Sequence, residues 1–153
     1  MMDPEIRVEL ASDPRLLCTL RAMVRTYVGL QGFPPDRVEE VVLAVDEACT
    51  NAIRHSYGGR RDARIEVSFR ALPDRIEIIL EDDGVPALRE RLAPRELRPP
   101  EGESITPGGL GVQIMYRVFD EVDFEPGERE GNRVTMRLRR PASPRDDAAD
   151  RMR

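Results

Sequence analysis

The stretch LAVDEACTNAIRHSY, residues 43–57, decides the fold more than any other part of the chain. On a helix at about 100° per residue, its apolar side chains fall in one arc. Glu47, Asn51 and His55 follow one another at four-residue spacing on a separate stripe. The helix predicted over residues 37–56 therefore packs one face on a core and presents a carboxylate, an amide and an imidazole on another. The same stripe also fits an ordinary solvated polar face.

The segments around this helix predict an α+β fold. An apolar period of two predicts strands near residues 6–10, 65–69, 76–80, 122–124 and 134–138. Three- and four-residue spacing of apolar side chains predicts a helix after Pro14 and another from Gly108. We therefore expect a two-layer sandwich, in which a mixed, mostly antiparallel sheet is covered on one face by about three helices.

A long proline-rich stretch, residues 87–107, separates the predicted hairpin from the glycine-rich helix start. Loops of this length in a compact domain are usually lids, binding loops or disordered segments. One domain is expected over residues 1–140. Residues 141–153 carry many charges and no aromatic residue, which predicts a disordered tail.

Composition excludes several classes of protein. All 24 basic residues among the 153 are arginine, so a P-loop and Schiff-base chemistry, which need lysine, are excluded. The net charge of -5 argues against direct binding of nucleic acid. No apolar stretch approaches the roughly 20 residues of a membrane span, and the N-terminus lacks a secretory signal. A cytoplasmic protein without a membrane partner is expected.

The single histidine, His55, excludes a metal site built from several histidines. Cys18 and Cys49 cannot form a disulfide framework, and both lie in segments of helical pattern. We expect both cysteines to be reduced, buried and small apolar residues of the core.

Two further motifs suit a ligand. Asp82 and Gly84 end an apolar strand, where a carboxylate can accept a hydrogen bond from a ligand amine and glycine allows close approach. The pair also fits a plain Asp-Gly turn. The glycines of residues 108–111 open a helix whose free N–H groups suit phosphate, although they also fit a hinge. With the amide of Asn51, the three motifs together describe an ATP site without lysine.

At these residues the sequence resembles the bacterial anti-sigma-factor serine/threonine kinases of the general-stress and sporulation type. Residues 43–57 look like their N-box, residues 108–115 look like their second glycine box, and residues 119–122 also fit. These kinases belong to the superfamily of the histidine-kinase ATPase domains, gyrase, Hsp90 and MutL. The resemblance runs from about residue 6 to residue 140 and implies a Bergerat-type ATP-binding fold, with residues 87–107 as the ATP lid.

The resemblance implies a role for each motif. Glu47 would be the catalytic general base, and Asn51 would ligate Mg²⁺ that bridges the phosphates. Asp82 would accept a hydrogen bond from the adenine amine, with Gly84 giving clearance. The glycines of the box would bring backbone N–H groups to the phosphates. The remaining ATP-binding residues that the resemblance implies are His55, Thr106, Gly108, Gly109, Leu110 and Gly111.

The lid departs from the pattern of the wider superfamily. Pro86 stands where the first glycine box, Asp-x-Gly-x-Gly, often has its second glycine, and it removes one N–H group. Lid arginines are candidates to reach phosphate, namely Arg89, Arg91, Arg95 and Arg98.

The function implied is an ATP-dependent protein serine/threonine kinase that acts as an anti-sigma factor. It would sequester a sigma factor, phosphorylate an anti-sigma antagonist and work as a homodimer. The alternatives are a non-catalytic ATP-binding switch that only binds protein partners, and an interaction module without nucleotide. Residues 129–140 hold five arginines and one glutamate, which fits either a charged edge strand or a contact for an acidic partner.

Overall fold

The computed structural model describes residues 4–94 and 109–142. The elements in chain order are β1 (Ile6–Ala11), the 3₁₀ turn η1 (Pro14–Leu16), α1 (Leu17–Leu30), α2 (Pro35–Asn51), the π-helical turn η2 (Ala52–Ser56), β2 (Arg64–Ala71), β3 (Arg75–Asp82), the 3₁₀ turn η3 (Arg89–Arg91), α3 (Gly109–Val118), β4 (Glu121–Pro126) and β5 (Asn132–Arg139). Residues 95–108 of the predicted lid and 143–153 of the predicted tail lie outside the described residues.

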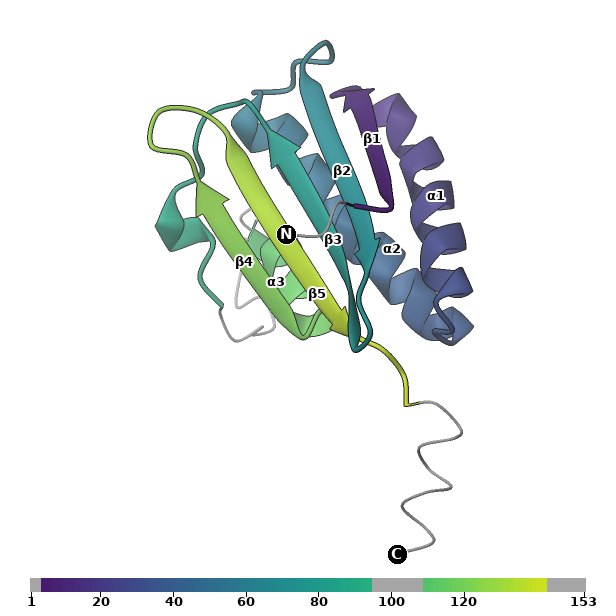
Figure 1. Ribbon diagram of the computed structural model, residues 1–153. Coiled ribbons are helices and arrows are strands. Elements are labelled where there is room, and N and C mark those ends of the chain that lie inside the picture. The colour runs from purple at the N-terminus through teal and green to yellow at the C-terminus, as the bar shows by residue number, and fades with distance from the viewer. Residues whose placement is uncertain (1–3, 95–108, 143–153) are drawn as a thin grey trace, which may run out of the picture.

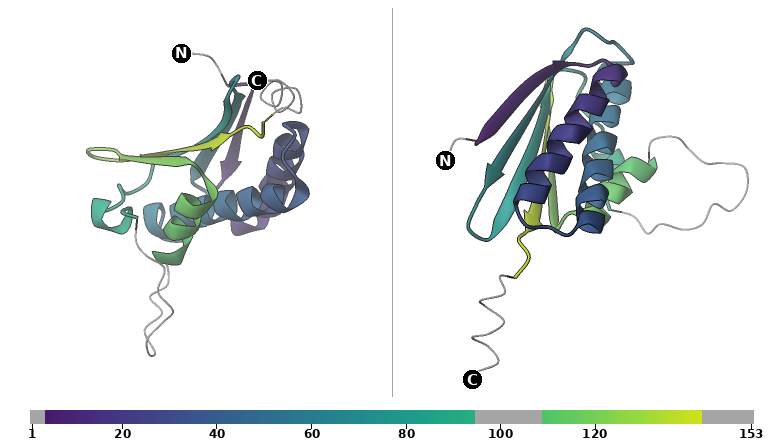
Figure 2. Two further views of the ribbon diagram at one scale, coloured as in Figure 1. Left: turned by 90° about the horizontal axis from the view of Figure 1, so that it is seen from below. Right: turned by 90° about the vertical axis from the view of Figure 1, so that its right-hand side faces the viewer.

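The five strands form one sheet in the order β1-β2-β3-β5-β4, and every neighbouring pair is antiparallel. The three α-helices cover one face of this sheet, as the edge-on view in Figure 2 shows, while the other face stays open (Figure 1). The predicted two-layer α+β fold is confirmed. The expectation of a mixed sheet is not met in the described part of the chain, because β2–β3 and β4–β5 are hairpins and β1 returns antiparallel to β2.

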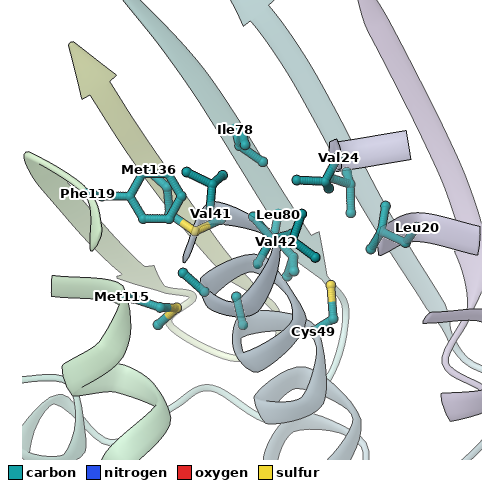
Figure 3. Close-up of a cluster of buried hydrophobic side chains, with 14 of the residues drawn as sticks. Leu20, Val24, Val41, Val42, Cys49, Ile78, Leu80, Met115, Phe119 and Met136 are labelled. Atoms are coloured by element: carbon teal, nitrogen blue, oxygen red, sulfur yellow. The ribbon is translucent and has the colours of Figure 1, made fainter. Parts of the chain in front are cut away.

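The core lies between the sheet and the helices. Because side chains alternate along a strand, Ile76, Ile78 and Leu80 of β3 all point toward the helices and are almost completely buried. Figure 3 shows Val41 and Cys49 of α2 packed in the same layer. Burial of each such side chain contributes about 1.5–3 kcal/mol, so this layer fixes how α2 lies across β3.

The open face of the sheet carries a charge network centred on Glu77, whose side chain is only 1% exposed. The strand register places Glu77 of β3 between Arg70 of β2 and Arg137 of β5. Both guanidinium groups pair with its carboxylate, and Arg75 Nε joins them at 3.1 Å. The carboxylate is therefore buried beneath three arginine side chains.

Of the two interpretations of the arginine-rich segment, a charged edge strand is wrong, and a contact for an acidic partner stays a prediction. β5 lies between β3 and β4, and its guanidinium groups extend over acidic neighbours on both sides. Arg133 pairs with Glu81 at 3.5 Å, while Arg137 reaches Asp123 in addition to Glu77. These arginines thus neutralise carboxylates of the sheet itself.

The two cysteines differ. Cys49 is buried in the core, as predicted. The prediction is wrong for Cys18, which is exposed on α1 because its position points away from the sheet while Leu17 and Leu20 beside it are buried. None of the described helices is long and apolar enough to span a bilayer.

Candidate functional site

A cavity of about 710 Å³ opens where the C-terminal end of β3 and the start of β5 meet the helix layer. It is lined by apolar side chains with a few polar groups among them, which is typical of sites for small ligands. Three of the predicted residues line it, namely Asn51, His55 and Asp82. The cavity therefore brings together residues 31 positions apart, from α2, η2 and β3.

Asp82 is the last residue of β3 on the helix side, which is why it points into the cavity. Its side chain accepts hydrogen bonds from Gly84 N (2.9 Å) and Asn132 Nδ2 (3.0 Å) on Oδ1, and from Ser56 Oγ (3.1 Å) on Oδ2. Burial raises the pKa of Asp82, and these hydrogen bonds offset only part of that effect. A buried carboxylate held at a cavity wall is suited to accept a hydrogen bond from a ligand.

Asn132 was not singled out from the sequence. It lies opposite Asp82 in the register of β3 and β5, so only the strand pairing reveals it. Besides Asp82, its Nδ2 donates to Val85 O at 3.0 Å, and its Oδ1 accepts from Ala87 N at 2.7 Å. One amide thus fixes both the carboxylate and the segment that leads into the lid.

Replacing Asn132 is expected to weaken ATP binding. Asn132→Ala leaves the buried Asp82 carboxylate without one of its donors, at about 1–3 kcal/mol, and should weaken ATP binding about tenfold. It also removes a donor that lowers the pKa of Asp82, so the loss of affinity toward acidic pH should begin at a higher pH. Calorimetric titration with ATP at several pH values measures both effects.

Ser56→Ala is the matched control, because it removes the hydrogen bonds that Ser56 Oγ donates to Asp82 and accepts from Asn132, without touching the bonds of Asn132 to Val85 and Ala87. Ser56→Ala should also shift the pH dependence of ATP binding, but it should lower the affinity for ATP less than Asn132→Ala does. Equal losses in the two variants would mean that the contacts of Asn132 to the lid entry contribute nothing.

Gly84 is required by a close approach of two backbones. A Cβ at this position would lie 2.3 Å from Ser56 O, and Val85 N donates to the same oxygen at 2.8 Å. The clearance that Gly84 provides is therefore toward η2. Its predicted clearance for a nucleotide stays a prediction.

The helix predicted to run to residue 56 changes character after Asn51. Residues Ala52–Ser56 form a π-helical turn, in which Tyr57 N donates to Ala52 O at 3.1 Å. Such turns often occur at functional sites. His55 and Ser56 of this turn both line the cavity, although they are adjacent in sequence.

Glu47 lies on α2 one turn before Asn51 and is not among the residues that line the cavity. It instead meets α3, where a Cβ on Gly111 would lie 2.6 Å from Glu47 Oε2. Gly109 is the first residue of α3, and Leu110 beside it is exposed. The glycine box and the predicted base are therefore neighbours, whereas Thr106 and Gly108 lie outside the described residues.

The first part of the predicted lid rests on α3. Tyr116 Oη donates to Leu92 O at 2.5 Å, and Gln113 Nε2 donates to Ala93 O at 3.1 Å. Arg91 lines the cavity, while Arg89 lines a smaller hollow of about 160 Å³ next to it. Pro86 lies in the cavity wall, and Arg95 and Arg98 lie outside the described residues.

The cavity suits a hard cation that takes only one or two ligands from the protein and the others from phosphates and water. In the described part of the chain, no three histidine, cysteine or acidic side chains come together as a metal cage. Asn51 offers a single amide oxygen at the cavity wall. Mg²⁺ is usually held by one or two protein groups together with phosphates and water, so the residues present fit a magnesium-bound nucleotide.

Comparison with known proteins places the chain in a family. Residues 10–138 match the family described as "Histidine kinase-like ATPase domain". The chain is 30% identical over 123 residues to a protein named "Serine-protein kinase RsbW" from Bacillus licheniformis. The alignment covers 76% of this chain and 75% of the relative. It is 27% identical over 139 residues to a protein named "Anti-sigma F factor" from Clostridium novyi. That alignment covers 90% of this chain and 95% of the relative.

Among solved structures, the fold resembles that of the RsbU and RsbW domains of Rv1364c from Mycobacterium tuberculosis. The TM-score is 0.62 at 19% identity, over 92% of this chain and 34% of that one. This likeness concerns the fold. With the family match over most of its length, the chain belongs to the histidine kinase-like ATPase family.

Proposed function

We propose that this protein is an ATP-dependent protein serine/threonine kinase that acts as an anti-sigma factor. The observation that carries the proposal is the cavity lined by Asn51 and buried Asp82. Glu47 lies one turn before Asn51 on α2 and approaches the start of α3 at Gly111. Membership of an ATPase family implies the use of ATP. The names of the relatives, a serine-protein kinase and an anti-sigma factor, agree with both halves of the proposal.

The nucleotide would lie along the cavity from β3 toward α3. Asp82 accepts a hydrogen bond from the exocyclic amine of adenine, His55 borders the nucleotide, and the apolar wall packs against the base. Asn51 would hold Mg²⁺, which neutralises charge on the phosphates. The glycine-rich start of α3 directs N–H groups at the positive end of the helix toward the phosphates.

Glu47 would act on the hydroxyl of the protein substrate. The Ser or Thr oxygen attacks the terminal phosphorus, the bond from that phosphorus to the oxygen bridging to the β-phosphate breaks, and ADP leaves. The proton of the hydroxyl passes to the Glu47 carboxylate as general base. Most of the remaining catalysis is positioning and charge neutralisation.

The proposed partners are proteins. Leu43, one turn before Glu47, is 49% exposed, and Leu110, next to Gly111, is 56% exposed. These two exposed apolar side chains, one on each of the helices that meet at Glu47, are suited to contact the phosphorylatable segment of an anti-sigma antagonist. A sigma factor as second partner, a homodimer and a cytoplasmic location complete the proposal.

The test is to incubate the protein with Mg-ATP and its cognate antagonist and to measure the mass of the antagonist. The antagonist should gain one phosphate, mapped to a Ser or Thr. An unchanged mass, together with demonstrated ATP binding, would contradict the kinase.

One observation favours the alternative of a non-catalytic switch: Glu47 does not line the cavity. In that case ATP would change the affinity for protein partners without phosphate transfer. A partner pull-down with and without ATP, compared with the mass measurement, separates the two functions.

A further inference from the structure

We propose that Gly111 positions the Glu47 carboxylate, by leaving empty the place that a side chain on α3 would fill. This assigns Gly111 a role through Glu47, in addition to any contact of the glycine box with phosphate. The inference rests on the proposed function, since it concerns the base of that reaction.

The contact is specific to one end of the glutamate. An ideal Cβ on Gly111 would lie 2.6 Å from Glu47 Oε2, against 3.4 Å from its Cβ and 3.5 Å from its Cδ. Carbon atoms in contact normally lie about 3.5–4.0 Å apart, so only the carboxylate oxygen is severely overlapped. That oxygen ends a rotatable side chain, so an added methyl group would displace the carboxylate and leave the backbone in place.

The backbone itself does not call for glycine at this position. Within the described residues, the glycines with positive φ are Gly32, Gly58, Gly59 and Gly131. Gly111 is the third residue of α3, and glycine is a poorer helix former than alanine. The intrinsic propensity of the helix therefore opposes glycine, and the neighbouring carboxylate supplies a reason for it.

Other interactions do not fix the carboxylate. Among the described residues, no hydrogen bond or ion pair holds Glu47, in contrast to Asp46 beside it, which pairs with Arg21 at 2.8 Å. The close approach to α3 at Gly111 is therefore a contact that can limit where the carboxylate lies. This contact joins the proposed base on α2 to the first turn of α3.

The experiment compares Gly111→Ala with Gly29→Ala. Gly29 lies in α1 with no atom within 4 Å of an ideal Cβ, so it controls for the substitution itself. Gly111→Ala should lower kcat for phosphate transfer at least tenfold, keep the KM for ATP within about twofold and leave the melting temperature unchanged or higher. Gly29→Ala should keep kcat and KM.

A second comparison separates the role of Gly111 from the kinase proposal. In a Glu47→Gln background, Gly111→Ala should cause no further loss of rate. The ¹³C-carboxyl NMR signal of Glu47, assigned by its absence in Glu47→Gln, should shift in Gly111→Ala and stay in place in Gly29→Ala. This signal is measurable even if the protein transfers no phosphate.

Three results would overturn the inference. They are an unshifted Glu47 signal in Gly111→Ala, full kcat in that variant, or a loss of ATP affinity that accounts for the whole effect. A shifted signal in a protein that never phosphorylates a partner would support the inference and contradict the proposed function.

Discussion

Glu47→Gln is expected to lower the rate of phosphate transfer by about two to four orders of magnitude, which is the usual contribution of a general base. Glutamine keeps the shape of the side chain and cannot take the proton of the incoming hydroxyl. Glu47 does not line the cavity, so the affinity for Mg-ATP should stay unchanged. Single-turnover phosphorylation of the antagonist and titration with ATP measure the two quantities.

Glu39→Gln on the same helix is the control. Glu39 is exposed and pairs with Arg25 at 2.6 Å, away from the cavity, so its replacement should change neither quantity. If Glu47→Gln transfers phosphate as fast as this control, Glu47 is not the base. If it loses ATP binding, Glu47 belongs to the nucleotide site itself.

Glu77→Gln is expected to lower the free energy of unfolding by about 3 kcal/mol, the lower end of the range for removing one partner of a buried ion pair. The substitution leaves the guanidinium groups of Arg70, Arg75 and Arg137 around a neutral amide. Their partial exposure to water is the reason for choosing the lower end. Urea denaturation at neutral pH measures the change.

The same residue predicts a dependence on pH. Burial raises the pKa of Glu77, but the hydrogen bonds from the three arginines outweigh burial and leave this pKa below its ordinary value. Its contribution to stability is therefore fully present above the ordinary glutamate pKa and is lost as the pH falls through the lowered value. Glu77→Gln should remove that part of the acid sensitivity.

Glu121→Gln is the matched control on the same face of the sheet. Glu121 is 63% exposed and lies 3.5 Å from Arg137, so its loss should change the free energy of unfolding by less than about 1 kcal/mol. If Glu77→Gln is no more destabilising than this control, the buried network contributes little to stability.

The parts of the fold that the sequence predicts well are those governed by local patterns. The alternation at residues 65–69 and 76–80 predicts two strands, because apolar residues with a period of two fall on one face of a strand. The short turn between them predicts that β2 and β3 form a hairpin. The spacing in residues 43–57 likewise predicts the buried face of α2. Cys18 shows the limit, since an apolar residue next to a helix stripe can lie on either side of it.

The parts that the sequence does not predict depend on contacts between distant elements. Asn132 is a functional candidate only because β5 pairs with β3 in the register that sets it opposite Asp82. The contact of Gly111 with Glu47 depends on how α3 crosses α2. The π-helical turn at Ala52–Ser56 leaves no trace in the apolar spacing, which is that of an ordinary helix.

A crystal structure with Mg²⁺ and a non-hydrolysable ATP analogue tests most directly whether these residues hold a magnesium-bound triphosphate. The expected result is adenine in the cavity with its amine on Asp82, Mg²⁺ on the Asn51 amide oxygen, and the terminal phosphate facing Glu47. A nucleotide bound elsewhere, or bound in the cavity with its phosphates directed away from Asn51, would contradict the assignment.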